Sequence, residues 1–485
     1  MKKTKVIQKV LLVFALCAVV FFAKNEITKA ADFNITSPAN GSILGAGYND
    51  IKWDSVSGAF NYDVYIGGTK VTTTTDTTYT YYSVRVQAQE VCVVANLTNG
   101  YQKASNKVQF GITKKGLGLN MSMGNYLDLK DWKLGWYYNW GETPYDRDNY
   151  KGVEYVPMIW KSTTANDTKT RANKAKSSKY KYLLTFNEPD LPGQCNMSVD
   201  AVKTAWAGLK GIDGIKISSP VTARWPKASS GWFQPFMNKL TTADRSPDFI
   251  SIHCYPENYA GAGMANWFVE EVVDWTWNTY HKPIWITEFS TTGNSVSMSA
   301  TTEFWKAVMP KLDARDYVER YAAFGFNAKN AGTKNVGLWY YSTGMWTDAG
   351  AVYKAQGNPD FSKVLLSGVD YSKLNLEPGS STGGSSVKYP KPGKAKIKSA
   401  KYKKSKKISV KLKKISKAKG YNVRWCDNKK FDGFEGKHIK KLSYTIKGLE
   451  KNTKYFVKAR AYNYDANGAK QYGKWSTIKK VKVKK

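Results

Sequence analysis

The central part of the chain alternates two kinds of segment, and this alternation most strongly limits the folds that the chain can adopt. Short apolar runs ending in polar, glycine or proline residues are separated by longer stretches with helical spacing, such as Phe304, Val308 and Leu312. Repeated strand–helix units build parallel sheets. The predicted strands are Gly116–Asn120, Lys133–Tyr138, Tyr155–Trp160, Tyr182–Asn187, Ile215–Ser219, Phe249–Tyr255, Ile284–Glu288 and Val336–Tyr341. Residues 115–372 therefore predict an α/β fold of the size of a TIM (β/α)8 barrel.

Two glutamates close predicted strands in this region. Glu188 follows Asn187 in an Asn-Glu-Pro sequence after the fourth strand, and Glu288 ends the seventh. A charged residue that closes a buried strand is costly unless function or pairing keeps it there. Strands four and seven of such a barrel face each other across its catalytic mouth. Glycoside hydrolysis requires two carboxyl groups that act on the same glycosidic bond. The structural alternative is that these glutamates belong to a buried ion pair.

The motifs around these glutamates resemble glycoside hydrolase family 128, within the clan of retaining barrel glycosidases. The ordered motifs are Leu134–Gly141, Tyr155–Trp160, Asn187–Asp190, Ser219–Pro220, Asp248–Tyr255 and Trp285–Phe289. Several members of that family act on β-1,3-glucans, so the resemblance implies a retaining β-glucanase, most simply an endo-β-1,3-glucanase. It implies Glu188 as the acid/base and Glu288 as the nucleophile. It also implies that Asn187 contacts the substrate 2-hydroxyl and that Tyr255 orients Glu288.

Other residues near the strand ends are candidates for binding the substrate. His253 shares a strand face with Tyr255, so it is expected to point into the cleft, although a lone histidine is as often structural. Four aromatic residues near strand ends can stack on sugar rings or pack in the core: Tyr138, Trp140, Trp160 and Trp339. Cysteine and histidine spacing indicates no metal site, and no cofactor is expected. The sequence does not decide whether Cys195 and Cys254 form a disulfide.

Segments rich in predicted β-strands flank the central region. Residues 33–112 alternate apolar and polar positions, which predicts a β-sandwich of the fibronectin type III or immunoglobulin-like kind. Residues 394–485 resemble fibronectin type III more clearly, because Leu449 lies six residues before Tyr455, as in a tyrosine corner. A flexible Gly/Ser/Pro linker is expected over residues 373–393.

The positive charge is concentrated at one end of the chain. The net charge is +36, and residues 388–485 alone hold 33 Lys and Arg against 5 Asp and Glu. These lysines are most simply the solvated face of a sandwich. A functional alternative is contact with an anionic cell-wall polymer. Nucleic acid is not expected as a partner, because no nucleic-acid-binding motif accompanies the charge.

The first thirty residues have the pattern of a secretory signal. Four lysines precede an apolar run at Val10–Ala23, and Thr28 and Ala30 offer small residues before a cleavage site. The run is short for a membrane span. We therefore expect a protein that is secreted, extracellular or cell-wall associated.

The expected substrate is a polysaccharide, and the expected state is a monomer. The alternatives are a related glycosidase acting on another β-glycan and a non-catalytic wall- or glycan-binding protein.

Overall fold

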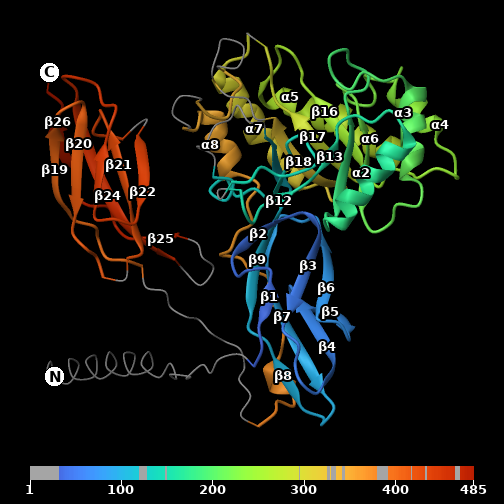
Figure 1. Cartoon of the computed structure of the whole chain (residues 1–485), viewed down its shortest axis with the longest axis horizontal. Helices are drawn as coiled ribbons and strands as arrows, with labels where there is room; N and C mark the ends of the chain where they lie inside the picture. Colours follow the sequence, from blue (N-terminus) through green and yellow to red (C-terminus); the bar gives the residue numbers. More distant parts are fainter. Residues whose placement is uncertain are drawn as a thin grey trace, which may run out of the picture.

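The computed structural model has a mixed α/β fold with several separate sheets. It describes residues 32–119, 128–147, 150–293, 295–324, 328, 335–340, 345–378, 391–416, 418–431, 434–464 and 470–484. The predicted signal at 1–30 and most of the predicted linker, residues 379–390, lie outside the described residues. Figure 1 shows a group of blue strands, a central region of strands and helices, and a group of orange-red strands.

The N-terminal strands form two sheets that bury one shared cluster. One sheet contains β1 (Ile35–Ser37), β3 (Gly47–Trp53) and β6 (Thr78–Ser83). The other contains β2 (Ser42–Gly45), β9 (Val108–Thr113), β7 (Gln87–Leu97), β4 (Ala59–Ile66) and β5 (Thr69–Thr74), with β8 (Gln102–Ala104) beside β7. Ile51 and Trp53 from the first sheet pack with Val64 and Ile66 from the second. The alternating pattern of the sequence thus marks the residues that face this core.

The central strands pair in parallel throughout. They are β10 (Lys115–Gly118), β11 (Trp136–Tyr137), β12 (Glu154–Tyr155), β13 (Met158–Ile159), β14 (Tyr182–Asn187), β15 (Lys216–Val221), β16 (Ile250–Cys254), β17 (Ile284–Phe289) and β18 (Val318–Phe324). They form the sheets β10-β18-β17-β16, β13-β14-β15 and β11-β12. Isolated parallel bridges join Ser218 to Phe249 and Gly118 to Tyr138. Parallel pairing brings the carboxyl ends of these strands to the same side, where the predicted glutamates lie.

The helices of the central region alternate with these strands along the chain and lie around them in space (Figure 1). They are α2 (Ala165–Ser177), α3 (Val199–Trp206), η2 (Ala207–Leu209), α4 (Phe233–Lys239), α5 (Gly261–Trp267), the π-helix η3 (Phe268–Asp274), α6 (Trp275–Tyr280), α7 (Met298–Asp313) and α8 (Asp348–Ala355). In α7 the predicted helical spacing is confirmed, because Phe304, Val308 and Leu312 are all buried. Ser297 caps this helix by accepting a hydrogen bond from the Ala300 backbone N–H.

The last strand of the central region differs from the sequence prediction. We expected it at 336–341, where no strand is present among the described residues 336–340, and the structure instead forms β18 at Val318–Phe324. β18 pairs in parallel with both β10 and β17. The sequence conceals this strand because Glu319 and Arg320 are polar, yet both are buried. Asn375 and Glu377, which the sequence assigns to the linker, hydrogen-bond with Gln102 of β8.

Arg320 links the central region to the N-terminal sheets. Its guanidinium lies 4.4 Å from the ring centroids of both Tyr182 and Trp285. It donates to the Ala46 carbonyl at 2.7 Å and to Glu154 at 2.7 Å. Burial of an arginine is tolerated here because each contact pairs the charge or its donors. The bond to the Ala46 carbonyl therefore joins the two parts of the chain, while the other contacts of Arg320 lie within the central region.

Replacing Arg320 with methionine is expected to destabilise this joint. The change leaves the Ala46 carbonyl and the Glu154 carboxylate without their donor, which costs roughly 3 kcal/mol, at the lower end of the range for a broken buried pair. Thermal unfolding should show a lower Tm. Arg85→Ala is the matched control, because the Arg85–Asp316 pair crosses the same joint with side chains 71% and 60% exposed. Equal Tm values for the two variants would contradict the expectation.

The C-terminal strands form two further antiparallel sheets over their own core. One contains β19 (Ile397–Lys403), β20 (Lys407–Leu412) and β23 (Ser443–Ile446). The other contains β22 (Glu435–Ile439), β21 (Gly420–Cys426), β24 (Lys454–Tyr464) and β25 (Lys470–Tyr472), with β26 (Lys479–Lys482) beside β24. The Tyr455 hydroxyl accepts a hydrogen bond from the Glu450 backbone N–H at 3.1 Å, which is the predicted tie to the upstream backbone.

Two predictions about the rest of the chain can be compared with the structure. Cys195 and Cys254 are both buried and form no disulfide. Within the described residues, no helix combines the length and the apolar character that crossing a bilayer requires.

Candidate active site

Strand β14 delivers Glu188 through an unusual backbone conformation. Phe186 and Glu188 have φ values of 43° and 47°, a left-handed region that bulky residues rarely adopt. The Glu188 backbone N–H donates to the Val221 carbonyl at 2.7 Å, so the neighbouring strand β15 holds this turn. Glu188 is only 6% exposed. Such strain persists where the surroundings fix it, and it is concentrated at functional sites.

Glu288 on β17 is surrounded by hydrogen-bond donors. Its Oε1 accepts from the Tyr138 hydroxyl at 3.0 Å and from Trp140 Nε1 at 2.8 Å, and its Oε2 accepts from the Tyr255 hydroxyl at 2.5 Å. Burial and the charge of Glu288 raise the pKa of Tyr138 and of Tyr255 well above the usual value. Both tyrosines therefore remain protonated and act as donors. Together these contacts fix the position of both carboxylate oxygens.

His253 on β16 lies between the two glutamates. Its Nδ1 is 2.9 Å from Glu188 Oε1, and its Nε2 is 3.4 Å from Glu288 Oε1. Burial alone would lower the pKa of His253, but the charges of Glu288 and Glu188 and the hydrogen bond with Glu188 raise it. One oxygen from each glutamate and one histidine nitrogen lie within 4.8 Å of one another.

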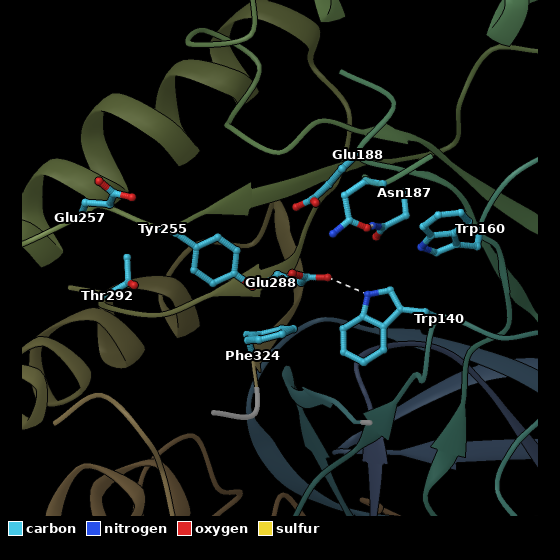
Figure 2. Close-up of a pocket in the computed structure, with 10 residues that line it drawn as sticks. Trp140, Trp160, Asn187, Glu188, Tyr255, Glu257, Glu288, Thr292 and Phe324 are labelled. Atoms are coloured by element: carbon cyan, nitrogen blue, oxygen red, sulfur yellow. Dashed lines mark hydrogen bonds between the residues drawn. The ribbon is translucent and has the colours of Figure 1, made fainter. Parts of the chain in front are cut away.

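Glu188 and Glu288 border a cleft with a volume of about 500 Å³. Figure 2 shows the Glu188 and Glu288 side chains extending toward the same space, with Trp140, Trp160 and Asn187 on one side. The residues that line the cleft are Trp140, Trp160, Asn187, Glu188, Gln194, Tyr255, Glu257, Glu288, Thr292 and Phe324. Aromatic rings beside polar groups suit a ligand with apolar faces and hydroxyl edges, as a sugar has.

Comparison with known proteins identifies the central region. The family described as glycosyl hydrolase catalytic core matches residues 116–353. A family 128, subgroup I endo-β-1,3-glucanase from Amycolatopsis mediterranei, solved with laminaritriose, is 30% identical, with 50% of this chain and 99% of that chain covered and a TM-score of 0.43. The chain belongs to glycoside hydrolase family 128. The membership rests on sequence identity over almost the whole of that enzyme.

A second family 128 structure differs in its described action. A subgroup III curdlan-specific exo-β-1,3-glucanase from Blastomyces gilchristii is 27% identical, with 50% of this chain and 97% of that chain covered and a TM-score of 0.39. Proteins with curated descriptions gave no match. The central region is thus a glycoside hydrolase core.

The structure places most of the predicted site residues of this hydrolase together. Glu188, Glu288, Asn187, Tyr255, Trp140 and Trp160 all line the cleft. His253 and Tyr138 do not line it but contact the glutamates from beneath, and both side chains are fully buried. Trp339 is not brought to the cleft: it is 1% exposed and packs against Trp132 in the core. The predicted function of Trp339 in stacking on sugar therefore has no support in its position.

Four residues that line the cleft were not predicted from sequence. Gln194 accepts a hydrogen bond from the Asn187 amide at 3.2 Å. Glu257 and Thr292 form a parallel bridge between the loops after β16 and β17. Phe324 ends β18, the strand that the sequence analysis missed. Only Glu257, two residues after Tyr255 in a recognised motif, had a sequence signal that could have drawn attention to it.

The cluster of Glu188, His253 and Glu288 also has the span of a metal site. Tyr138 and Trp140 already donate hydrogen bonds to the Glu288 oxygen nearest His253. A cation at that oxygen would have to displace these donors. The donor set is therefore suited to holding a carboxylate and a proton rather than a metal ion.

His253 gives the hydrolase a stability component that depends on pH. Because its pKa is raised in the folded state, the stabilisation is complete below the unfolded value of 6.5 and is lost as pH rises through the folded value. Thermal unfolding of the wild type and His253→Gln should show the largest Tm difference below pH about 6.5, with the difference shrinking at higher pH. A Tm difference that is constant with pH would show that the histidine acts only by packing.

Proposed function

We propose that the protein is a secreted retaining β-glucanase, most simply an endo-β-1,3-glucanase. The observation that carries this proposal is the pair Glu188 and Glu288, whose oxygens lie within 4.8 Å across a polar and aromatic cleft. Retaining glycosidases hold their carboxyl groups about 5–5.5 Å apart, whereas inverting enzymes leave room for water at about 6.5–9.5 Å. Both family 128 relatives described above are β-1,3-glucanases.

The proposed reaction is a double displacement. Glu288 attacks the anomeric carbon while Glu188 protonates the departing oxygen, so the glycosidic bond breaks and a glycosyl ester forms. Glu188 then removes a proton from water, which attacks the same carbon and releases Glu288. The 2.9 Å contact of Glu188 with His253 lets these two groups share the proton before Glu188 passes it to the departing oxygen. Tyr255 and Trp140 keep Glu288 aimed throughout.

Asn187 is proposed to bind the substrate next to the reacting bond. It is 2% exposed, lines the cleft, and its side-chain oxygen has no hydrogen-bond partner among the described residues. A buried oxygen without a partner is costly, so a substrate hydroxyl that donates to it would gain affinity. The 2-hydroxyl is the group that the family resemblance implies.

Other parts of the proposal concern the whole chain. The parallel pairings and bridges support a (β/α)8 barrel in the central region, and the paired sheets at each end support sandwiches of the fibronectin III or immunoglobulin-like kind. We propose that residues 1–30 direct export and that the lysine-rich C-terminal domain retains the enzyme on an anionic wall polymer. The enzyme would act as a monomer without a cofactor.

Early digestion of a linear β-1,3-glucan tests the proposed action. An endo enzyme should release a range of oligosaccharides before glucose accumulates, whereas an exo enzyme releases one small product from the start. Proton NMR during the first turnovers should show the β anomer before mutarotation, because two inversions restore the configuration. An initial α anomer would contradict the nucleophilic function of Glu288. Absence of cleavage in this glucan and turnover of a β-1,4-linked glucan would reassign the substrate.

A further inference from the structure

The outer face of one C-terminal sheet carries three cations in neighbouring positions. Arg424 on β21 lies directly opposite Lys458 on β24, and Arg460 lies opposite Asn422 on the same pair of strands. Like charges in opposed positions destabilise a sheet. Among the described residues, the Nε atoms of both arginines have no hydrogen-bond partner, and none of the three cations forms an ion pair. The charge of Asp131 raises the pKa of both arginines, but Asp131 forms its ion pair with Lys354, so the positive charge of this face is only partly offset.

Aromatic rings hold the three cations in place. The Arg424 guanidinium carbon is 3.8 Å from the Phe434 centroid, and the Arg460 carbon is 3.6 Å from the Tyr472 centroid. At such distances the cation lies over the face of the ring, because an approach from the edge is longer. The Trp475 centroid is 4.9 Å from Arg424 and 4.5 Å from Arg460.

Lys458 completes the arrangement between the two arginines. Its Nζ is 3.8 Å from the Phe431 centroid and 4.9 Å from the Trp475 centroid. Trp475 therefore contacts all three cations. We call Arg424, Lys458, Arg460 and Trp475 the cation–aromatic face.

This packing leaves the arginines prepared to bind anions. A ring against the flat side of a guanidinium leaves the N–H groups in its plane unpaired. The Nε atoms of both arginines are buried, so the terminal Nη groups are the ones that match a carboxylate or a phosphate in two-point contacts. Burial and the charge of Arg460 lower the pKa of Arg424 to about 10, which reflects the cost of holding these charges together. An anion would relieve that cost, and the fixed side chains would lose little entropy on binding it.

The other sheet of the domain provides a contrast. Its exposed lysines include Lys401 on β19 and Lys411 on β20, which face Ser409 and Ser399 across the strand pair. Such lysines are flexible and strongly hydrated, so they attract anions without fixed geometry. The positive charges are thus held at fixed positions on the cation–aromatic face, whereas those of the other sheet are carried by flexible side chains.

We propose that the cation–aromatic face binds the carboxylate or phosphate groups of an anionic wall polymer. This inference rests on the proposed retention of the enzyme on such a polymer and assigns that retention to one face. It does not depend on the glucanase reaction, because these residues lie outside the catalytic cleft.

Full-length variants with the same change of charge test the assignment. Arg424→Gln with Arg460→Gln removes two charges from the cation–aromatic face, and Lys401→Gln with Lys411→Gln removes two from the other sheet. Affinity is measured for polygalacturonate, which carries carboxylates, and for poly(glycerol phosphate), which carries phosphates. The arginine pair should lose about tenfold or more in affinity for the preferred polymer, and the lysine pair about twofold or less. The preferred polymer identifies the anionic group.

A variant that preserves the net charge is the control for weaker binding caused by misfolding. Arg424→Lys with Arg460→Lys keeps the net charge but removes the two-point contacts, so it should also bind several-fold more weakly. Unchanged affinity in this variant, or equal losses in the two glutamine pairs, would overturn the assignment and leave general electrostatic retention. If the wild type binds neither polymer, both the face and the proposed retention are wrong. Turnover of a soluble oligosaccharide should be the same in every variant, so the glucanase proposal is judged separately.

Discussion

Replacing Glu288 with glutamine is expected to reduce kcat/KM on β-1,3-glucan by more than about 10⁴-fold, the largest effect of any single change in this enzyme. The amide cannot attack the anomeric carbon, so the glycosyl ester does not form. Its NH₂ group also faces donors in either orientation, namely Tyr138 and Trp140 at one position or Tyr255 at the other. The loss should be as large on aryl glycosides as on glucan, because a better leaving group does not replace the nucleophile.

Chemical rescue separates loss of the nucleophile from loss of structure. In Glu288→Ala, azide can enter the space left by the carboxylate and attack an aryl β-glycoside from the side opposite the leaving group. The bond to the aryl oxygen breaks, a bond to nitrogen forms, and the product is the α-glycosyl azide. Isolation of the β-glycosyl azide would place the nucleophile elsewhere. Glu257→Gln is the control, because Glu257 lines the same cleft without a contact to either glutamate; its loss should be far smaller.

The sequence predicted the part of the site that lies on regular strands. Glu188 and Glu288 end apolar runs that form β14 and β17 with nearly the predicted bounds. The apolar runs fix these strands because the strands are buried on both sides. The order of the motifs along the chain then predicted that the two glutamates lie close together. This prediction did not depend on the helices between them.

The contacts beneath the carboxylates could not be predicted in the same way. His253 and Tyr138 come from different strands, and their distances to the glutamates depend on strand register and rotamers. The αL conformation of Glu188 is likewise a product of its surroundings, because no glycine marks the position. Local sequence carries little information about any of these.

Strand β18 shows how contacts with another part of the chain can conceal a strand. Glu319 accepts hydrogen bonds from the Tyr82 hydroxyl at 2.5 Å and from Trp285 Nε1 at 2.7 Å, and Arg320 contacts the N-terminal sheets. Each residue thus gains one of its hydrogen bonds only when the N-terminal sheets are in place. The polarity of these residues argues against a buried strand in the sequence, which favours the more apolar run at 336–341.

Replacing Glu188 with glutamine is expected to impair the enzyme in a way that depends on the leaving group. On β-1,3-glucan the departing oxygen needs a proton, so kcat/KM should fall by about 10²–10⁴-fold. An aryl glycoside with an acidic phenol leaves without that proton, so formation of the glycosyl ester should be almost unchanged. Release of the ester still needs a base, so a burst of phenol followed by slow turnover is the expected time course.

With Glu188→Gln, azide should give a product of the opposite anomeric configuration to the product from Glu288→Ala. It needs no base, so it can attack the glycosyl ester from the face opposite Glu288 and restore turnover as the β-glycosyl azide. The fold should persist, because Glu188 is held by its backbone bond to Val221, which the change does not touch. Equal losses on glucan and on the aryl glycoside, or an α-glycosyl azide, would show that Glu188 is not the acid/base. His253, 2.9 Å from the replaced carboxylate, would then be the group to test for that function.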